Sequence, residues 1–494
     1  TNCRLEIKPH RDGAILVVAH NGWENIGADN AYHMAQRKRF GEVWIEALQR
    51  ARKLVGYREL GPIFTLRLGT QRAVALIGPE HHRFFFDQVD NVLSLPEVYR
   101  FVIPMFGQVL NAAELPERRR HLEILRDALR GKKLRTYVEL MAAETSAWLD
   151  TLGDEGEFEL WESLQSLSMR IAASTLMGAE IRARIEEFVP LYEDLAGGMD
   201  FVLPPNLPLP RFRRRDRARR DLFELIQPMI AERQRNPERY PDFLCALAHA
   251  TEADGRALQA ETIVGLSLLT LFTAYIATAA QSSWSLILLL QHPHYLNPVL
   301  RELKTVLGDD PRTLSVEALD GLERLGRALK ESERLRPVFS HYARYNARSY
   351  DHGGFHVPRG YLTMICPAVA HRLPEVFSDP DRFDPERFAP DRAEDRRTPH
   401  GLIGFGGGFY RCPGMMFGTN EMKVSLSLLL GRYSLELVDP DPRPNYDIGI
   451  VRPAPPCRIR YRRRRERHVG THRHSNVVKL VPHPQSSDRD RASA

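Results

Sequence analysis

The stretch FGGGFYRCPG, residues 405–414, decides the fold of this chain. Its three consecutive glycines permit backbone angles that other residues resist, so the chain can turn tightly beneath a flat ligand. Cys412 leads into GMMFGTNEMKVSLSLLLGRY, residues 414–433, which has a helical pattern. A cysteine near a helix N-terminus has its thiolate favoured by the dipole and the free N–H groups. The stretch therefore predicts a thiolate ligand for haem iron rather than a buried structural cysteine.

Two further signatures precede this stretch. KESERLRP, residues 330–337, places Glu331 and Arg334 on one helix face, and FDPERF, residues 383–388, supplies Arg387. Together with the cysteine stretch they resemble the cytochrome P450 family, whose loop reads Phe-Gly-x-Gly-x-Arg-x-Cys-x-Gly. The positions that match this loop are Phe405, Gly406, Gly408, Cys412 and Gly414, whereas Tyr410 stands at the arginine position with Arg411 beside it.

The resemblance implies a mainly α fold with a small β-rich lobe, the cytochrome P450 fold. It implies heme b with Cys412 as the axial iron ligand. In the family, the residues that match Glu331, Arg334 and Arg387 form a buried charge network that braces the cysteine loop.

The resemblance narrows to one branch of the family. VYRFVIPMFGQVL, LPERRR, LPLPRFRRRDRARRDL and HYARYNARSY are similar to sterol 14-alpha-demethylases, especially soluble bacterial members, from about Gly61 to Arg462. This implies that Tyr99 and Arg344 hold the haem propionates, that Tyr410 replaces a histidine with that role, and that Arg120 or His121 adds a basic contact. The residues matched to the substrate cavity are Phe101, Phe106, Tyr275, His341 and Tyr342, with plain core packing the alternative for the aromatic side chains.

The segment LFTAYIATAAQSSW, residues 271–284, departs from that branch. There, Phe-Ala-Gly-x-His-Thr is followed by Trp seven residues after the Thr. Counting back from Trp284 places Ala277 at the Thr and Ile276 at the His. Alanine neither donates nor accepts a hydrogen bond, so proton delivery would need Thr278 aimed by a helix bulge, ordered water, or a substrate hydroxyl.

The rest of the chain reads as mostly helical. Residues 60–80 predict two strands joined at Gly69–Thr70, helical periodicity runs from Arg118 to Leu335, and strand signals return after Pro337. RFRRRDRARR, residues 211–220, predicts a loop leading into a solvated helix face. No Asp, Glu, Lys or Arg occurs from Thr262 to Leu300, and we expect a buried helix there rather than a membrane span.

Composition sets broad limits. The 494 residues are 43% hydrophobic and 27% charged with a net charge of +6, which is ordinary for a globular protein and does not indicate nucleic-acid binding. Five scattered cysteines favour a reduced, cytoplasmic compartment, with a removed N-terminal anchor left open. The expected organisation is an N-terminal segment packing on the domain (1–60), the cytochrome P450 domain (61–462), and a basic, disordered tail (463–494).

These expectations combine into a haem-thiolate monooxygenase that oxidises an apolar steroid- or terpenoid-like substrate with dioxygen. Electrons would come from a separate ferredoxin or reductase, because no redox domain is fused to the chain, and the basic excess would help to dock an acidic ferredoxin. Two alternatives stay open because of Ala277. One is a relay-independent haem-thiolate enzyme, either a peroxide-driven oxidase or an isomerase, and the other is a non-catalytic haem- or lipid-binding protein.

Overall fold

The computed structural model describes residues 2–10, 13–21, 56–68, 71–131, 133–200, 205, 207–240, 242–308, 314–446 and 449–464. By internal contacts the chain divides into two units, Thr1–Arg463 and Arg464–Ala494. The expected domain organisation stays a prediction, since most of segment 1–60 and nearly all of tail 463–494 lie outside the described residues. In the N-terminal segment, β1 (Asn2–His10) pairs antiparallel with β2 (Gly13–Asn21).

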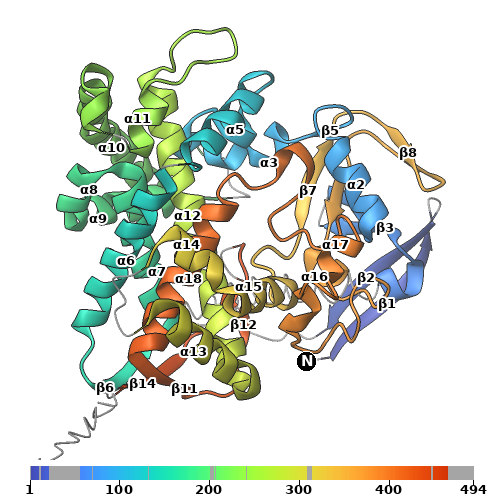
Figure 1. Cartoon of the computed structure of the whole chain (residues 1–494). Helices are drawn as coiled ribbons and strands as arrows, with labels where there is room; N and C mark the ends of the chain where they lie inside the picture. The colour runs from blue at the N-terminus through green and yellow to red at the C-terminus, as the bar shows by residue number, and fades with distance from the viewer. Residues whose placement is uncertain are drawn as a thin grey trace, which may run out of the picture. The chain divides into compact units, whose positions relative to one another are not determined.

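Helices make up most of the first unit, as the sequence predicts (Figure 1). The longer ones are α2 (Pro79–Asp87), α5 (Glu117–Ala128), α6 (Lys133–Thr151), α7 (Leu160–Ala172), α9 (Ile185–Ala196), α10 (Pro210–Arg235), α12 (Ala260–Gln291), α13 (Pro293–Leu307), α15 (Glu323–Leu335) and α18 (Met415–Arg432). Shorter ones include α3 (Pro96–Tyr99), α4 (Ile103–Phe106), α8 (Ala179–Ala183), α11 (Phe243–Ala248), α14 (Val316–Gly321), α16 (Pro367–Ala370) and α17 (Glu394–Arg397).

The basic run at residues 211–220 differs from the expectation of a loop. It forms the first turns of α10, which starts at Pro210, a residue suited to the first helical position. Phe212, Arg215 and Ala218 recur at helical spacing and are buried, so the run has an inward face as well as a solvated one.

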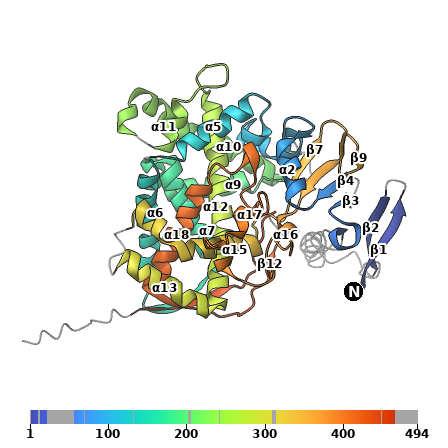
Figure 2. The ribbon, with the colours of Figure 1, turned by 45° about the vertical axis from the view of Figure 1, so that its right-hand side comes forward.

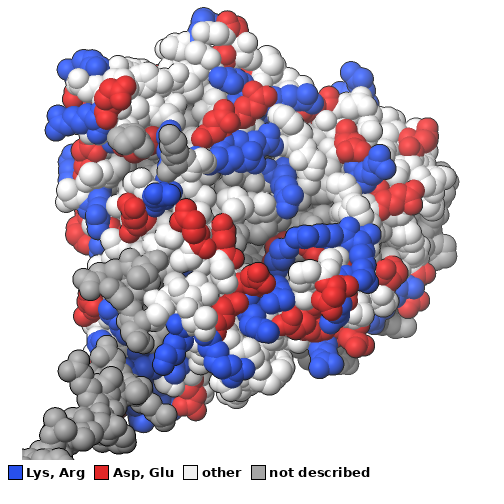
Figure 3. Space-filling model, viewed as in Figure 1, with Lys and Arg blue, Asp and Glu red and all other residues white. Residues whose placement is uncertain are grey.

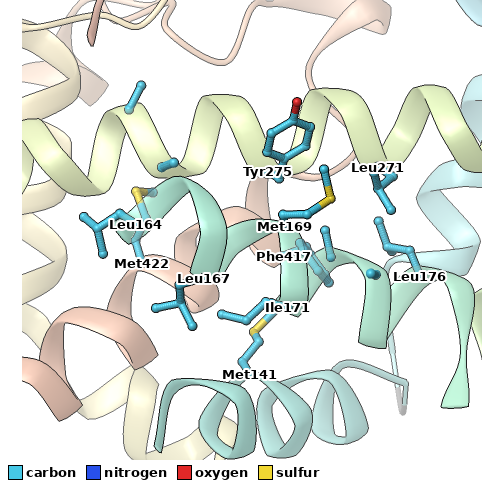
Figure 4. Close-up of a cluster of buried hydrophobic side chains, with 14 of the residues drawn as sticks. Met141, Leu164, Leu167, Met169, Ile171, Leu176, Leu271, Tyr275, Phe417 and Met422 are labelled. Carbon is cyan, nitrogen blue, oxygen red and sulfur yellow. The ribbon is translucent and has the colours of Figure 1, made fainter. Parts of the chain in front are cut away.

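Helix α12 forms the centre of the hydrophobic core. It carries the long apolar segment, and it is the one described helix long and apolar enough to cross a membrane, yet most of it is buried inside the protein. On one of its faces Leu271 and Tyr275 pack with Met169 and Ile171 of α7, and Phe417 of α18 joins the same cluster (Figure 4). Because protein surrounds α12 on most sides, apolar residues occur all round this helix.

The β-rich lobe is a mixed sheet in the order β3-β4-β10-β7-β5. Its strands are β3 (Ile63–Leu68), β4 (Gln71–Leu76), β10 (Leu362–Ile365), β7 (Tyr342–Asn346) and β5 (Leu93–Ser94). The predicted pair β3 and β4 is antiparallel, whereas β10 runs parallel to β4, with Leu362 opposite Ala73. Figure 2 shows this sheet beside α2, on the opposite side of the helices from α6 and α13.

A second sheet, in the order β11-β14-β6, joins segments from both halves of the unit. Its strands are β11 (Tyr433–Leu437), β14 (Arg458–Arg463) and β6 (Glu155–Glu159), and the remaining short pairs are β8 (Tyr350–His352) with β9 (Phe355–Val357) and β12 (Pro444–Asn445) with β13 (Arg452–Pro453). The fold class is thus the predicted one, mainly α with a small β-rich lobe.

Candidate functional site

The loop before α18 folds into a tight turn around Cys412. The Cys412 N–H donates to the Phe405 carbonyl at 2.9 Å, which closes the loop on itself. Gly406 and Gly408 have φ values of +73° and +58°, the left-handed region that favours glycine. Gly408 also lies against α2, where a Cβ would approach the Phe86 side chain at 3.2 Å. Residues other than glycine would strain this turn.

Cys412 is the exposed free cysteine among the described residues, whereas Cys245, Cys366 and Cys457 are buried. Neighbouring protein atoms nevertheless desolvate its sulfur. That desolvation raises the pKa of the thiol, while the Gly414 backbone N–H and the Arg411 charge lower it. The loop thus offers a sulfur ligand with free access and with two local groups that favour the thiolate.

Glu331, Arg334 and Arg387 form a fully buried charge network behind the loop. Arg334 donates from Nε to Glu331 Oε2 at 2.8 Å and from a second nitrogen to Oε1 at 2.9 Å, while Arg387 Nε lies 3.1 Å from Oε2. All three side chains are 0% exposed. Arg387 also pairs with Glu394 at 2.8 Å, so each buried charge has a partner of opposite sign.

This network reaches the cysteine loop through His371. Arg334 donates to the His371 carbonyl at 2.8 Å, and the His371 Nε2 accepts the Ile403 N–H at 2.9 Å. The Ile403 carbonyl in turn accepts the Gly406 N–H at 2.9 Å. Burial lowers the pKa of His371 to about 3, so the ring stays neutral and keeps Nε2 as an acceptor. The geometry is that of a brace running from α15 to the glycine turn.

Tyr99 and Arg344 lie together near the loop. They are hydrogen-bonded, and the Arg344 guanidinium also stacks over Phe85 with 4.9 Å to the ring centroid. Burial lowers the pKa of Arg344, and its Nε has no hydrogen-bond partner in the part of the chain that the structure describes. An orphaned donor on a buried arginine is what a carboxylate-bearing ligand would satisfy. These residues therefore fit a haem with its propionates.

Tyr410 has a partner that the sequence did not suggest. Its hydroxyl donates to Asp90, whose carboxylate also binds Arg118 and Arg119. Burial and the Asp90 hydrogen bond both raise the pKa of Tyr410. The predicted contact of Tyr410 with a propionate stays a prediction.

Arg118, Arg119 and Arg126 are residues of α5 that contact the loop, at Tyr410 and Phe409. Arg120 donates to the Thr251 carbonyl at 2.8 Å. His121 is buried, accepts the Leu110 N–H at 3.2 Å and lies 3.4 Å from Glu252. The haem contacts predicted for Arg120 and His121 therefore stay predictions. Arg118 occupies a buried position in the 3.6-residue pattern of α5 shared with Leu122 and Leu125, which is a signal that sequence reasoning missed.

Helix α12 is continuous across the oxygen-activation segment, without a bulge. Thr278 is buried and points to α18, where a Cβ on Gly418 would lie 3.4 Å from its Oγ1. Ile276 and Ala277 are partly exposed, and they lie about 200° and about 100° around α12 from Thr278. The bulge that would aim Thr278 at the haem is therefore not present.

The five predicted substrate-contact residues differ in exposure and in the protein contacts that they make. Phe101 and His341 are partly exposed, and Phe101 stacks on Tyr99 with 6.1 Å between ring centroids. Phe106 is buried against Phe272 of α12 at 5.9 Å. The other two are occupied by protein contacts: Tyr275 is buried in the core beside Tyr192, and the Tyr342 hydroxyl donates to the Gly404 carbonyl.

A cavity of about 820 Å³ lies on the outer side of the cysteine loop. It is lined by α15, the loop and the start of α18, and its basic residues are Arg327, Lys330, Arg396, Arg411 and Lys423. Glu323, Glu333 and Asp395 line the same cavity, and Figure 3 shows acidic and basic side chains mixed around the hollowed centre of this face. Cys412 itself does not line this cavity.

Comparisons with known proteins agree with this geometry. The family model described as Cytochrome P450 matches residues 46–461. A sterol 14-demethylase from Arabidopsis thaliana is 32% identical over 83% of this chain and 86% of its own length, and a sterol 14alpha-demethylase from Mycolicibacterium vanbaalenii is 32% identical over 82% and 92%. The solved structure titled retinoic acid bound cyanobacterial CYP120A1 superposes with a TM-score of 0.75 at 25% identity, covering 84% of this chain and 96% of that one.

Proposed function

This chain belongs to the cytochrome P450 family, a haem-thiolate monooxygenase family, and we propose that it hydroxylates an apolar steroid- or terpenoid-sized substrate. The observation that supports the proposal most is the closed glycine turn, which holds Cys412 as an exposed cysteine without a disulfide partner. When bound, heme b with a thiolate ligand supplies the chemistry that inserts one oxygen atom of dioxygen into a C–H bond, consuming two electrons and two protons and releasing water.

In this proposal each part of the site holds the haem in a different way. Cys412 is the axial ligand, and Phe405, Gly408 and Gly414 keep the loop in the shape that exposes its sulfur. Arg344 binds a propionate, because it is buried and its Nε has no partner among the described residues, and Tyr99 is hydrogen-bonded beside it. Tyr410 acts indirectly, by orienting Asp90 and Arg118 beside the loop.

The substrate class rests on the relatives and on the apolar side chains near the site. Two of the relatives named above are sterol 14-demethylases, at 32% identity. Phe101 and Ile276 offer apolar surface, and His341, 3.0 Å from Ser340 Oγ, offers a polar group to a hydroxyl on the substrate. A sterol or terpenoid alcohol matches that combination.

Electron supply is proposed to come from a separate ferredoxin or reductase in the cytoplasm. The cavity beside the cysteine loop supports docking there, since Arg411, the neighbour of Cys412 in the chain, lines it with Lys423 and with Lys330, which pairs with Asp395. An acidic partner would meet these charges at the surface nearest the iron ligand.

The test is a visible-spectrum titration of the purified ferric protein with lanosterol, a 14-methylated sterol, and with a panel of terpenoid alcohols. We expect a saturable low-spin to high-spin shift with at least one of them, followed by a hydroxylated product when a ferredoxin, its reductase and NADPH are added. A shift with terpenoids alone would exclude the sterol. Ligand binding without product under either dioxygen or peroxide would contradict the proposal and favour a binding protein, and product with peroxide alone would favour a relay-independent oxidase.

A further inference from the structure

The exposure pattern of α12 singles out Thr273. From Ile263 to Leu289 every residue of this helix is buried or partly buried except Thr273, which is exposed. The partly exposed residues nearest to it are Phe272, Ala274, Ile276 and Ala277. In this stretch Thr273 is thus the residue that the neighbouring described elements leave uncovered.

The phase of the helix places Thr273 on the same face as Ala277. Side chains four residues apart lie about 40° apart around a helix and stack one above the other. Thr278 is about 140° away from Thr273, on the side where Leu271 and Tyr275 pack against α7 (Figure 4). Thr273 is therefore one turn from the position where the relatives of this chain are expected to carry their alcohol, and on the correct face.

The hydroxyl of Thr273 has unused hydrogen-bonding capacity. Its Oγ1 lies 3.2 Å from the Leu269 carbonyl and 3.1 Å from the Thr270 carbonyl, so its proton is directed to the helix backbone. A hydroxyl oxygen has two acceptor sites besides its one donor. An acceptor site can hold a water molecule that donates one proton to Oγ1 and directs its other proton away from the helix.

We propose that Thr273 is the positioning residue that replaces the missing alcohol at Ala277, by holding the water that delivers protons on the substrate side of the haem. This inference rests on the proposed monooxygenase function. Coupled turnover converts substrate RH, O2, two electrons and two protons into ROH and H2O. Uncoupled turnover sends the same O2, two electrons and two protons to H2O2. A lost relay therefore appears as peroxide gained at the expense of product.

The experiment compares Thr273→Val, Thr273→Ser and the matched control Thr278→Val. Product and peroxide formed per NADPH consumed would be measured with a ferredoxin, its reductase and whichever probe of the titration panel is converted. We expect Thr273→Val to lower the product-to-peroxide ratio by about tenfold or more, since positioned proton transfer contributes about 10²–10⁴-fold. Thr273→Ser should retain coupling, Thr278→Val should resemble the wild type, and adding Ala277→Thr to Thr273→Val should restore product.

A second readout does not depend on turnover. Because the water held by Thr273 contributes to the low-spin state, substrate-free ferric Thr273→Val protein should show a larger high-spin fraction than the wild type or Thr278→Val. Equal ratios and equal spectra in the two valine variants would overturn the role of Thr273. A wild type that forms no product from any probe would instead overturn the proposed function, and the spin balance would still decide the role of Thr273.

Discussion

Polar side chains are organised differently behind the cysteine loop and along α12. Behind the cysteine loop, Glu331, Arg334 and Arg387 are fully buried and each is paired at 2.8–3.1 Å. Along α12 the hydroxyls of Thr270, Thr273 and Ser283 donate only to carbonyls of their own helix. The first arrangement fixes one geometry, because removing any member leaves a buried charge exposed to apolar surroundings. The second leaves acceptor sites free, so chemistry there depends on which face of the helix each hydroxyl occupies.

The largest expected effect is at the sulfur itself. Cys412→Ser should abolish the haem-thiolate absorption signature of the ferrous carbon monoxide complex, because a serine hydroxyl is not a thiolate donor. The control is Cys245→Ser, which alters a buried free cysteine on α11 and should retain the signature. If Cys412→Ser kept the thiolate spectrum, the assignment of the axial ligand would be wrong.

Disrupting the buried network of Glu331, Arg334 and Arg387 should destabilise the whole protein. Arg334→Ala removes both hydrogen bonds to Glu331 and the bonds to the His371 and Pro380 carbonyls. We expect a loss of about 3–5 kcal/mol in the free energy of unfolding, measured by urea denaturation of the haem-loaded protein. Arg324→Ala is the matched control, since its pair with Glu386 is solvent-exposed and should contribute about 1 kcal/mol or less. Equal losses in the two variants would contradict a special role for the network.

A smaller effect should appear at Glu421, a buried carboxyl on α18 near Ser168 of α7. Burial raises its pKa to about 8, with Ser168 opposing the shift. An unfolded glutamate ionises near 4.5, so the folded state holds this proton more tightly, and its stabilising effect is lost as the pH rises from about 4.5 through 8. The wild type should therefore lose stability across this range.

Glu421→Gln should flatten that pH dependence, by more than about 1 kcal/mol between pH 5 and pH 8. The measurement is urea denaturation at four pH values, with the exposed Glu139→Gln as the control. Parallel pH profiles for the wild type and Glu421→Gln would show that the carboxyl does not titrate as its burial predicts.

The cysteine loop and the α15 pair were the more predictable parts of the site, because their residues form patterns that are local in the sequence. Gly406, Gly408 and Cys412 act through backbone angles and a helix terminus, and both leave a readable pattern over a few residues. The α15 pair is also local, at one helical spacing. The contact of Tyr410 with Asp90 joins residues distant in the chain, and no spacing rule predicts it.

The angular position of each side chain around α12 follows from its place in the sequence. Tyr275 lies two residues before Ala277, so about 200° of rotation places it on the opposite face, and its burial in the core follows. The same rotation of about 100° per residue places Thr273 on the same face of α12 as Ala277. The register counted from Trp284 stays a prediction, and the choice of Thr278 rested on adjacency in sequence, which does not bring side chains together on a helix.

The parallel pairing of β4 with β10 has a consequence for synthesis of the chain. Ala73 and Val74 of β4 pair with Leu362 and Thr363 of β10. The sheet therefore cannot form during translation until most of the protein has been made. Until then β3 and β4 form at most an isolated hairpin, which is marginally stable in water. A chain that stops before Leu362 would expose the buried edge of β4, and we expect such truncated products to aggregate rather than accumulate as a folded lobe.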